Sequence, residues 1–208
     1  MKYEWKKRDK ELYGAKRSPS LITVPRQNYI MISGVGNPNG QDFSNRVAAL
    51  HAFAYAIKMG YKSLAIMNGS EIRDFSIFPL EVVWNLPHSD ILTGEKMEYT
   101  IMIRQPDFVA KDTVTSALER LKAKKPNSLY SEMCFDIVQG GEYIEILHMG
   151  PYGDKSTSFT KMAQFIKDHG LTRTDRCHRE IYLNNPKRIE ASKLKTVLRC
   201  SVIALEKY

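Results

Sequence analysis

The sequence predicts an α+β fold in which two similar strand–helix–strand–strand modules follow one another along the chain. This prediction starts from an internal repeat. An alternating apolar strand, at 29–32 in the first half and at 143–146 in the second, runs into a turn rich in glycine and proline. A helical stretch and two further strands follow each turn. We therefore expect two pseudo-symmetric β-α-β-β halves with antiparallel sheets, at about residues 20–108 and 130–204.

The helical stretch of each half has apolar residues on one face. These residues are Phe43, Val47, Leu50, Ala54 and Ile57 in the first half and Phe159, Met162, Ala163 and Ile166 in the second. Gly60 and Gly170 are expected to end the helices, because glycine tolerates the left-handed conformation of a helix C-terminus. Asp42 and either Ser156 or Thr157 are the expected N-caps.

The strand after each helix contains a glutamate. These strands are Leu80–Trp84 and Arg179–Leu183, and a last strand rich in β-forming residues closes each half at 99–104 and 196–203. The glutamates, Glu81 and Glu180, therefore occupy matching places in the repeat.

Further strands are predicted at 133–138, turned back by Gly140-Gly141, and at 21–24. We expect residues 1–208 to form a single domain. It would include an N-terminal arm at 1–19 with a short helix, and a linker helix at about 109–125 that Pro126 ends.

Composition excludes several classes of protein. Hydrophobic residues make up 43% of the 208 and charged residues 26%, as in ordinary globular domains. No apolar run is long enough to span a membrane. The three cysteines have no metal-like spacing, which favours a reduced, cytoplasmic compartment. The net charge of +8 is scattered and accompanies no DNA- or RNA-binding motif, so we do not expect a nucleic-acid partner. No phosphate loop or histidine cluster occurs, and no cofactor or metal is expected.

Five ordered segments resemble the GyrI-like family of small-molecule-binding domains. They are Phe78–Trp84, Met102–Phe108, Ile146–Asp154 with its His-Met-Gly-Pro-Tyr turn, Glu180–Pro186 and Leu194–Arg199. Together they are most similar to a stand-alone bacterial branch that includes hydrolases of cyclopropanoid DNA-alkylating compounds. Two departures bear on ligand preference: Val82-Val83 and Asn85 replace a Gly-Leu-Trp-Trp pattern, and Asn185 replaces an aspartate.

The resemblance implies a fold like the effector-binding domains of bacterial transcription factors, with a central groove for bulky aromatic or cationic ligands. It also implies a carboxylate in that groove at Glu180. Since the chain contains no DNA-binding domain, a role as a transcription factor is not expected. Other relatives protect DNA gyrase, which is therefore a further candidate partner.

Glu180 is the first catalytic candidate, because an unpaired charge is costly to bury and glutamate is disfavoured in strands. Strand alternation places it with Tyr182, while Ile181 and Leu183 suit the face that the helix covers. We therefore expect Glu180 and Tyr182 to point away from the helices, into the groove. The alternative is a half-exposed strand with a solvated carboxylate.

Glu81 is the equivalent candidate in the first half. Alternation groups it with Val83 and groups Val82 with Trp84, so Glu81 and Trp84 would share one surface only across a bulge. The alternative is an edge-strand glutamate beside a core tryptophan. Glu81 and Trp84 are both kept as candidates to line the pocket.

Four more residues are candidates for ligand contact. His148 and Tyr152 flank the Gly-Pro turn. His148 could transfer a proton near neutral pH, and the alternative is that it only forms hydrogen bonds to nearby backbone. His178 is placed to orient Glu180, although neighbouring arginines suggest solvent. Tyr55 on the first helix is also a candidate, although we expect its side chain to lie in the hydrophobic core.

Two functions fit these residues. In the first, Glu180, with help from Glu81, activates water that opens a strained cyclopropane ring, while Tyr152, Tyr182 or His148 stabilises charge on the ligand. In the second, the same groove only sequesters a drug or protects gyrase.

Overall fold

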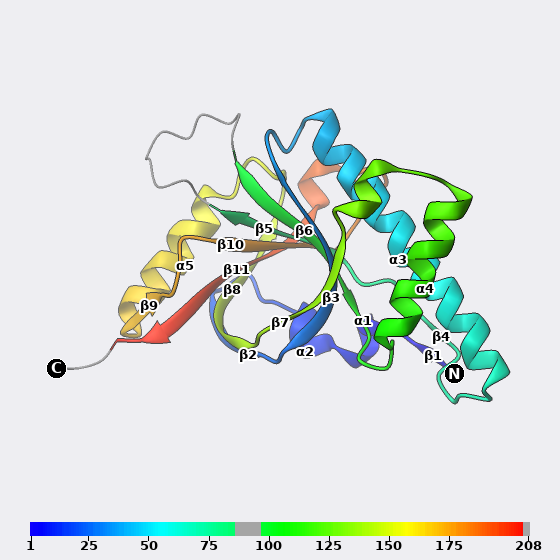
Figure 1. Ribbon diagram of the computed structural model, residues 1–208. Coiled ribbons are helices and arrows are strands. Elements are labelled where there is room, and N and C mark those ends of the chain that lie inside the picture. The colour runs from blue at the N-terminus through cyan, green and yellow to red at the C-terminus, as the bar shows by residue number, and fades with distance from the viewer. Residues whose placement is uncertain (86–96, 206–208) are drawn as a thin grey trace.

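The computed structural model describes residues 1–85 and 97–205 (Figure 1). The helices are α1 (Trp5–Arg8), α2 (Lys10–Tyr13), α3 (Gln41–Met67), α4 (Lys111–Lys124) and α5 (Ser156–Asp168), with 3-10 turns η1 (Ser128–Ser131) and η2 (Ala191–Lys193). The strands are β1 (Lys2–Tyr3), β2 (Ser20–Val24), β3 (Gln27–Val35), β4 (Asp74–Phe75), β5 (Leu80–Asn85), β6 (Glu98–Gln105), β7 (Cys134–Val138), β8 (Gly141–Met149), β9 (Leu171–Arg173), β10 (His178–Tyr182) and β11 (Lys195–Ala204).

One antiparallel sheet of nine strands organises the molecule. Its order is β2-β8-β11-β10-β5-β6-β3-β7, and β9 adds to the end of β11. The predicted modules are β3-α3-β5-β6 and β8-α5-β10-β11, and they meet where β5 pairs with β10. The predicted α+β class with two pseudo-symmetric modules is thereby confirmed.

The outer strands exchange between the modules, which the sequence did not predict. β7 pairs with β3 of the first module, and β2 pairs with β8 of the second. The expected hairpin at Gly140-Gly141 is therefore wrong. The two crossing connections pass so closely that a Cβ on Gly140 would lie 2.4 Å from the carbonyl oxygen of Val24. Glycine is required at this crossing because any side chain would clash with backbone.

The helix ends were predicted with mixed success. Gly170, at φ +62°, follows α5 as expected. Gly60 does not end α3, because one glycine costs a long helix only about 1 kcal/mol. A Cβ there would lie 2.4 Å from the Arg120 guanidinium of α4, so the glycine admits close helix packing. The N-caps are Gly40 and Lys155 rather than Asp42 and Ser156 or Thr157.

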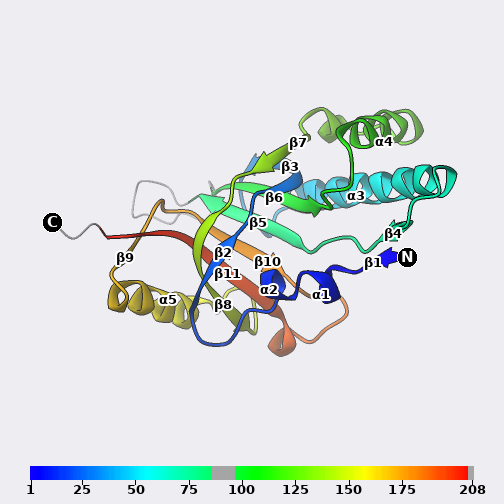
Figure 2. The same cartoon turned by 90° about the horizontal axis from the view of Figure 1, so that it is seen from below.

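The helices α3 and α5 cover the same face of the sheet, each over its own module. Leu50, Phe53 and Ile57 of α3 share a hydrophobic cluster with Ile30 and other residues of the first module. On α5, Met162 clusters with Ile144, Ile146 and Leu198. Figures 1 and 2 show the central strands β5 and β10 running between the two helices.

The N-terminal arm covers the opposite face of the sheet. It forms two helices of four residues each, where one short helix was expected. Asp9 accepts a hydrogen bond from Arg104 at 2.9 Å, and the carbonyl oxygen of Leu12 accepts one from Arg199. The arm is thus tied to the sheet by buried arginines.

Membrane insertion through a helix finds no support in the described residues. Within 1–85 and 97–205, no helix combines the length and the apolar character needed to cross a bilayer.

Substituting Gly140 with alanine should destabilise the protein. The added methyl group would meet the backbone of Val24 and Arg26, and overpacking of this kind costs about 1–3 kcal/mol. Thermal unfolding followed by circular dichroism measures the loss. Gly141→Ala is the matched control, because its Cβ would meet only Tyr143 at 3.8 Å. Equal melting temperatures for the two variants would contradict the close crossing.

Candidate functional site

A polar cluster centred on Glu180 lies where the two modules join. Glu180 is paired in register with Val82 of β5 and Leu198 of β11. Leu198 packs in the hydrophobic cluster of α5, so Glu180 lies on the face that carries the helices. The expectation that it would point away from them is wrong. The reason is that Lys155, His178 and Tyr182 supply donors on this face, which compensate the buried carboxylate.

The carboxylate of Glu180 receives three donors. Lys155 Nζ lies 2.5 Å from Oε1, His178 Nε2 lies 3.0 Å from the same oxygen, and the Tyr182 hydroxyl donates to Oε2 at 2.8 Å. The Glu180 side chain is only 2% exposed. The predicted pairing of Glu180 with Tyr182 on one face, and its contact with His178, are both found in the structure. His178 packs edge to face on Phe159 of α5, and only 11% of its side chain is exposed, so it is not directed to solvent.

The charge state of Glu180 follows from these contacts. Burial by itself raises the pKa of the carboxyl, but hydrogen bonds from His178 and Lys155 and the positive charge of Lys155 outweigh it and lower the pKa to about 2. Glu180 is therefore ionised at neutral pH. A carboxylate with so low a pKa is a weak base, better suited to orienting its neighbours than to removing a proton.

Aromatic side chains surround the cluster. Tyr152 and Tyr182 meet edge to face with ring centroids 5.0 Å apart. Phe43 of α3 stacks on Trp84 at 5.7 Å. Burial and the nearby charge of Glu180 raise the pKa of both Tyr152 and Tyr182, so both phenols keep their protons at neutral pH. These rings offer flat apolar surface beside a hydrogen-bonding group.

Two buried polar atoms beside Glu180 have no hydrogen-bond partner among the described residues. They are the indole Nε1 of Trp84 and the hydroxyl of Thr196. Trp84 is paired in register with His178, and Thr196 with Tyr182, so both point to the face of Glu180. The Trp84 N–H approaches Tyr182 closely enough to oppose the rise in its pKa, without completing a hydrogen bond. Unsatisfied buried polar groups are rare, so these two atoms mark the region beside Glu180 as a candidate site.

Glu81 lies on the opposite face of the sheet. It is paired in register with Ile181, and the strand has no bulge, so Glu81 and Trp84 point apart. Its carboxylate contacts Arg179 Nη1 at 3.4 Å and the Tyr29 hydroxyl at 3.2 Å, and the side chain is 1% exposed. The structure therefore does not bring the two glutamates together.

Two other candidates are also separate from Glu180. His148 shares its face, but Nδ1 bonds the Ser158 hydroxyl at 3.1 Å and Nε2 bonds the carbonyl oxygen of Pro151 at 3.2 Å. It thus ties the Gly-Pro turn to α5, as the structural alternative expected. Tyr55 is 59% exposed on α3, so the expectation that it belongs to the core is wrong.

Lys155 and Thr196 were missed by sequence reasoning. Lys155 occupies the N-cap of α5, where a positive charge opposes the helix dipole and no side-chain capping bond forms. That unfavourable placement is the one sequence signal that singles out Lys155. In the sequence, Thr196 is an ordinary β-forming residue without a functional signal. Only the register of β10 with β11 places it in the cluster.

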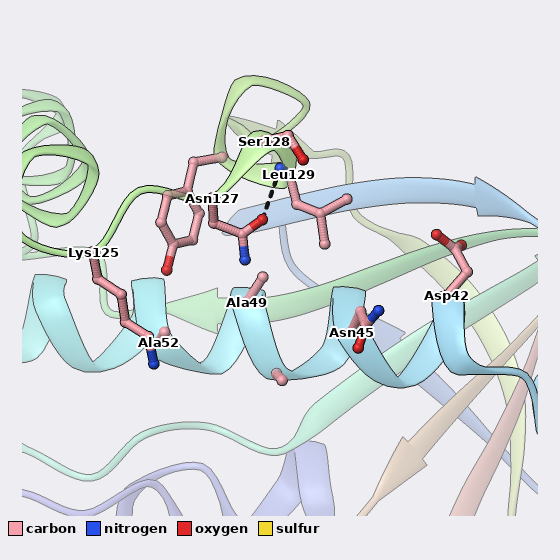
Figure 3. Close-up of a pocket in the computed structure, with 10 residues that line it drawn as sticks. Asp42, Asn45, Ala49, Ala52, Lys125, Asn127, Ser128 and Leu129 are labelled. Atoms are coloured by element: carbon pink, nitrogen blue, oxygen red, sulfur yellow. Dashed lines mark hydrogen bonds between the residues drawn. The ribbon is translucent and has the colours of Figure 1, made fainter.

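A separate hollow lies between α3 and the segment 125–130 (Figure 3). Its volume is about 550 Å³, and its walls include Asp42, Asn45, Ala52 and Lys125. None of the predicted site residues and none of the unpaired buried polar atoms of the described residues line it. The Glu180 cluster is therefore the stronger candidate.

Comparison with known proteins supports the same fold. The GyrI-like small molecule binding domain matches residues 17–200. A hydrolase from Listeria innocua is 33% identical, with a TM-score of 0.83 over 98% of this chain and 100% of the other. A conserved protein from the same organism is also 33% identical, with a TM-score of 0.84 over 97% of this chain and 100% of the other.

A more distant solved structure shares the fold at low sequence identity. The C-terminal domain of EcmrR is 11% identical, with a TM-score of 0.56 over 90% of this chain and 98% of the other, and shows a shared fold alone. No curated protein matches. The family match covers most of the chain and includes β10, on which the Glu180 cluster is built. The chain belongs to the family of GyrI-like small-molecule-binding domains.

Proposed function

We propose that the Glu180 cluster binds bulky aromatic small molecules and hydrolyses cyclopropanoid DNA-alkylating compounds, which would protect the cell from them. The observation that carries this proposal is a buried, ionised carboxylate beside aromatic rings and two unpaired buried polar atoms. Similarity to a hydrolase over the whole chain supports a hydrolytic reaction.

The reaction would add one water molecule to the strained ring. The water oxygen forms a bond to a ring carbon while a carbon–carbon bond of the cyclopropane breaks. The released electron pair moves to the conjugated carbonyl oxygen of the ligand, which takes up a proton. Release of ring strain supplies much of the driving force, so modest acid–base assistance suffices.

The contacts of the cluster suggest which residue would take part in each step of this reaction. In the neutral tautomer that donates Nε2–H to Glu180, His178 keeps Nδ1 as an acceptor for the proton of the attacking water. Glu180 then holds the imidazole in place and stabilises the positive charge that it gains. The Tyr152 phenol, which burial keeps protonated, is the donor for the developing oxyanion. Tyr182 donates to Glu180 instead, and His148 is occupied by the Gly-Pro turn.

Replacing Glu180 with glutamine should slow hydrolysis of a cyclopropanoid by about 100-fold or more, because His178 loses its charged partner. Single-turnover kinetics with a purified cyclopropanoid measures the effect. Glu81→Gln is the control. It leaves Arg179 without its buried partner, so it should lower stability by about 3–5 kcal/mol yet spare the rate of the folded protein. A wild-type rate for Glu180→Gln would refute the catalytic assignment.

Acid should erase the contribution of Glu180 to stability. Its pKa is lowered from 4.5 to about 2, so the contribution is complete above pH 4.5 and disappears as the pH falls through 2. The difference in melting temperature between the wild type and Glu180→Gln should therefore narrow from pH 4.5 downward. Glu190→Gln, at a carboxylate whose side chain is 71% exposed, should show little difference throughout. A gap that stays constant to pH 2 would contradict the lowered pKa.

A second candidate function is binding without turnover, either to sequester a drug or to protect gyrase. The favouring observation is that all three donors already occupy the Glu180 carboxylate, which weakens it as a base. Mass spectrometry of a cyclopropanoid incubated with a tenth of its molar amount of protein distinguishes the two functions. Hydrolysis should convert most of the compound to its water adduct. Protection limited to one equivalent, with no adduct, would favour sequestration.

A further inference from the structure

The ammonium group of Lys155 forms an ion pair with the carboxylate of Glu180. Its Nζ is 2.5 Å from Oε1 of Glu180, and its side chain is 17% exposed while that of Glu180 is 2% exposed. Lys155 caps α5 in a position where its charge opposes the helix dipole. Helix stability therefore does not explain a lysine here, whereas the ion pair with Glu180 does.

The ion pair removes the attraction of this site for cations. Lys155 neutralises the charge of Glu180, and His178 and Tyr182 occupy what remains of the carboxylate. A cation could reach Glu180 only by displacing Lys155 into solvent, and it would meet repulsion from the ammonium group until then. A neutral ligand meets no such opposition.

The unpaired polar groups point to the chemistry of the preferred ligand. The indole N–H of Trp84 can only donate a hydrogen bond, and the Thr196 hydroxyl can donate as well. An ammonium group has three donors, so Lys155 retains donors beyond the one used by Glu180. Together with the rings of Tyr152 and Tyr182, these groups suit a flat molecule that carries an acceptor oxygen.

We propose that Lys155 is a specificity-determining residue that makes the Glu180 cluster select neutral, planar ligands with an acceptor oxygen over cations. This inference rests on the proposed ligand-binding function of the cluster and narrows its ligand class. It does not depend on whether the bound ligand is hydrolysed.

A matched pair of probes tests the selection. 10-Methylacridone and the 10-methylacridinium ion share a tricyclic shape, but the first is neutral with a carbonyl oxygen and the second is cationic. Fluorescence titration of the wild type should show tighter binding of the acridone. Lys155→Met should tighten binding of the cation about tenfold or more, because the carboxylate loses its charged partner, and should not tighten binding of the acridone.

Three further variants separate the local ion pair from general effects. Lys161→Met removes one exposed positive charge from α5 and should leave both affinities unchanged. Lys155→Arg keeps the charge and should keep the preference. Combining Lys155→Met with Glu180→Gln should cancel the gain for the cation. If Lys155→Met does not fold, Lys155→Gln takes its place, since its amide can still donate to Glu180 without carrying charge.

Two results would overturn the proposal. One is equal or tighter binding of the cation by the wild-type protein. The other is an unchanged cation affinity in a folded Lys155→Met or Lys155→Gln variant. Failure of the hydrolysis proposal would look different, because the probe preferences would hold while a cyclopropanoid gave no water adduct.

Discussion

The pairing of β5 with β10 is the interaction on which the rest of the structure depends. It joins two modules into one continuous sheet, and each of the two strands carries a buried glutamate. Because Glu180 is paired with Val82 while Glu81 is paired with Ile181, the two carboxylates point to opposite faces. A single strand pairing therefore produces two separate polar centres. One lies between the helices, and the other lies under the N-terminal arm.

Both centres bury the charge of a carboxylate, but they pair it with different cations. A buried carboxylate is tolerated only with a partner, and each glutamate has its own cation. Arg179, beside Glu81, is 7% exposed and lies against the rings of Tyr29 and Tyr143. Lys155, beside Glu180, is a flexible side chain that retains some exposure. The cation beside Glu81 is thus buried, whereas the cation beside Glu180 keeps some contact with solvent.

The repeat also differs between its copies in ways that matter for the site. α3 has 27 residues and continues far past Gly60, whereas α5 has 13 and ends before Gly170. The shorter module supplies Lys155, His178 and Tyr182, and the longer one contributes Trp84 with its stacked Phe43. Exchange of the outer strands β2 and β7 then interlocks the modules. The cluster therefore has a polar side and an aromatic side.

The sequence by itself determined the repeat, the strand positions and the grouping of Glu180 with Tyr182, because these follow from local periodicity along the chain. It also identified Gly170 as a helix end, where a positive φ is required. Only the tertiary structure decided which face Glu180 occupies, that Lys155 reaches it, and that β7 pairs with β3 rather than with β8. Those outcomes depend on strand register and helix placement between segments that are separate along the chain, which local patterns do not encode.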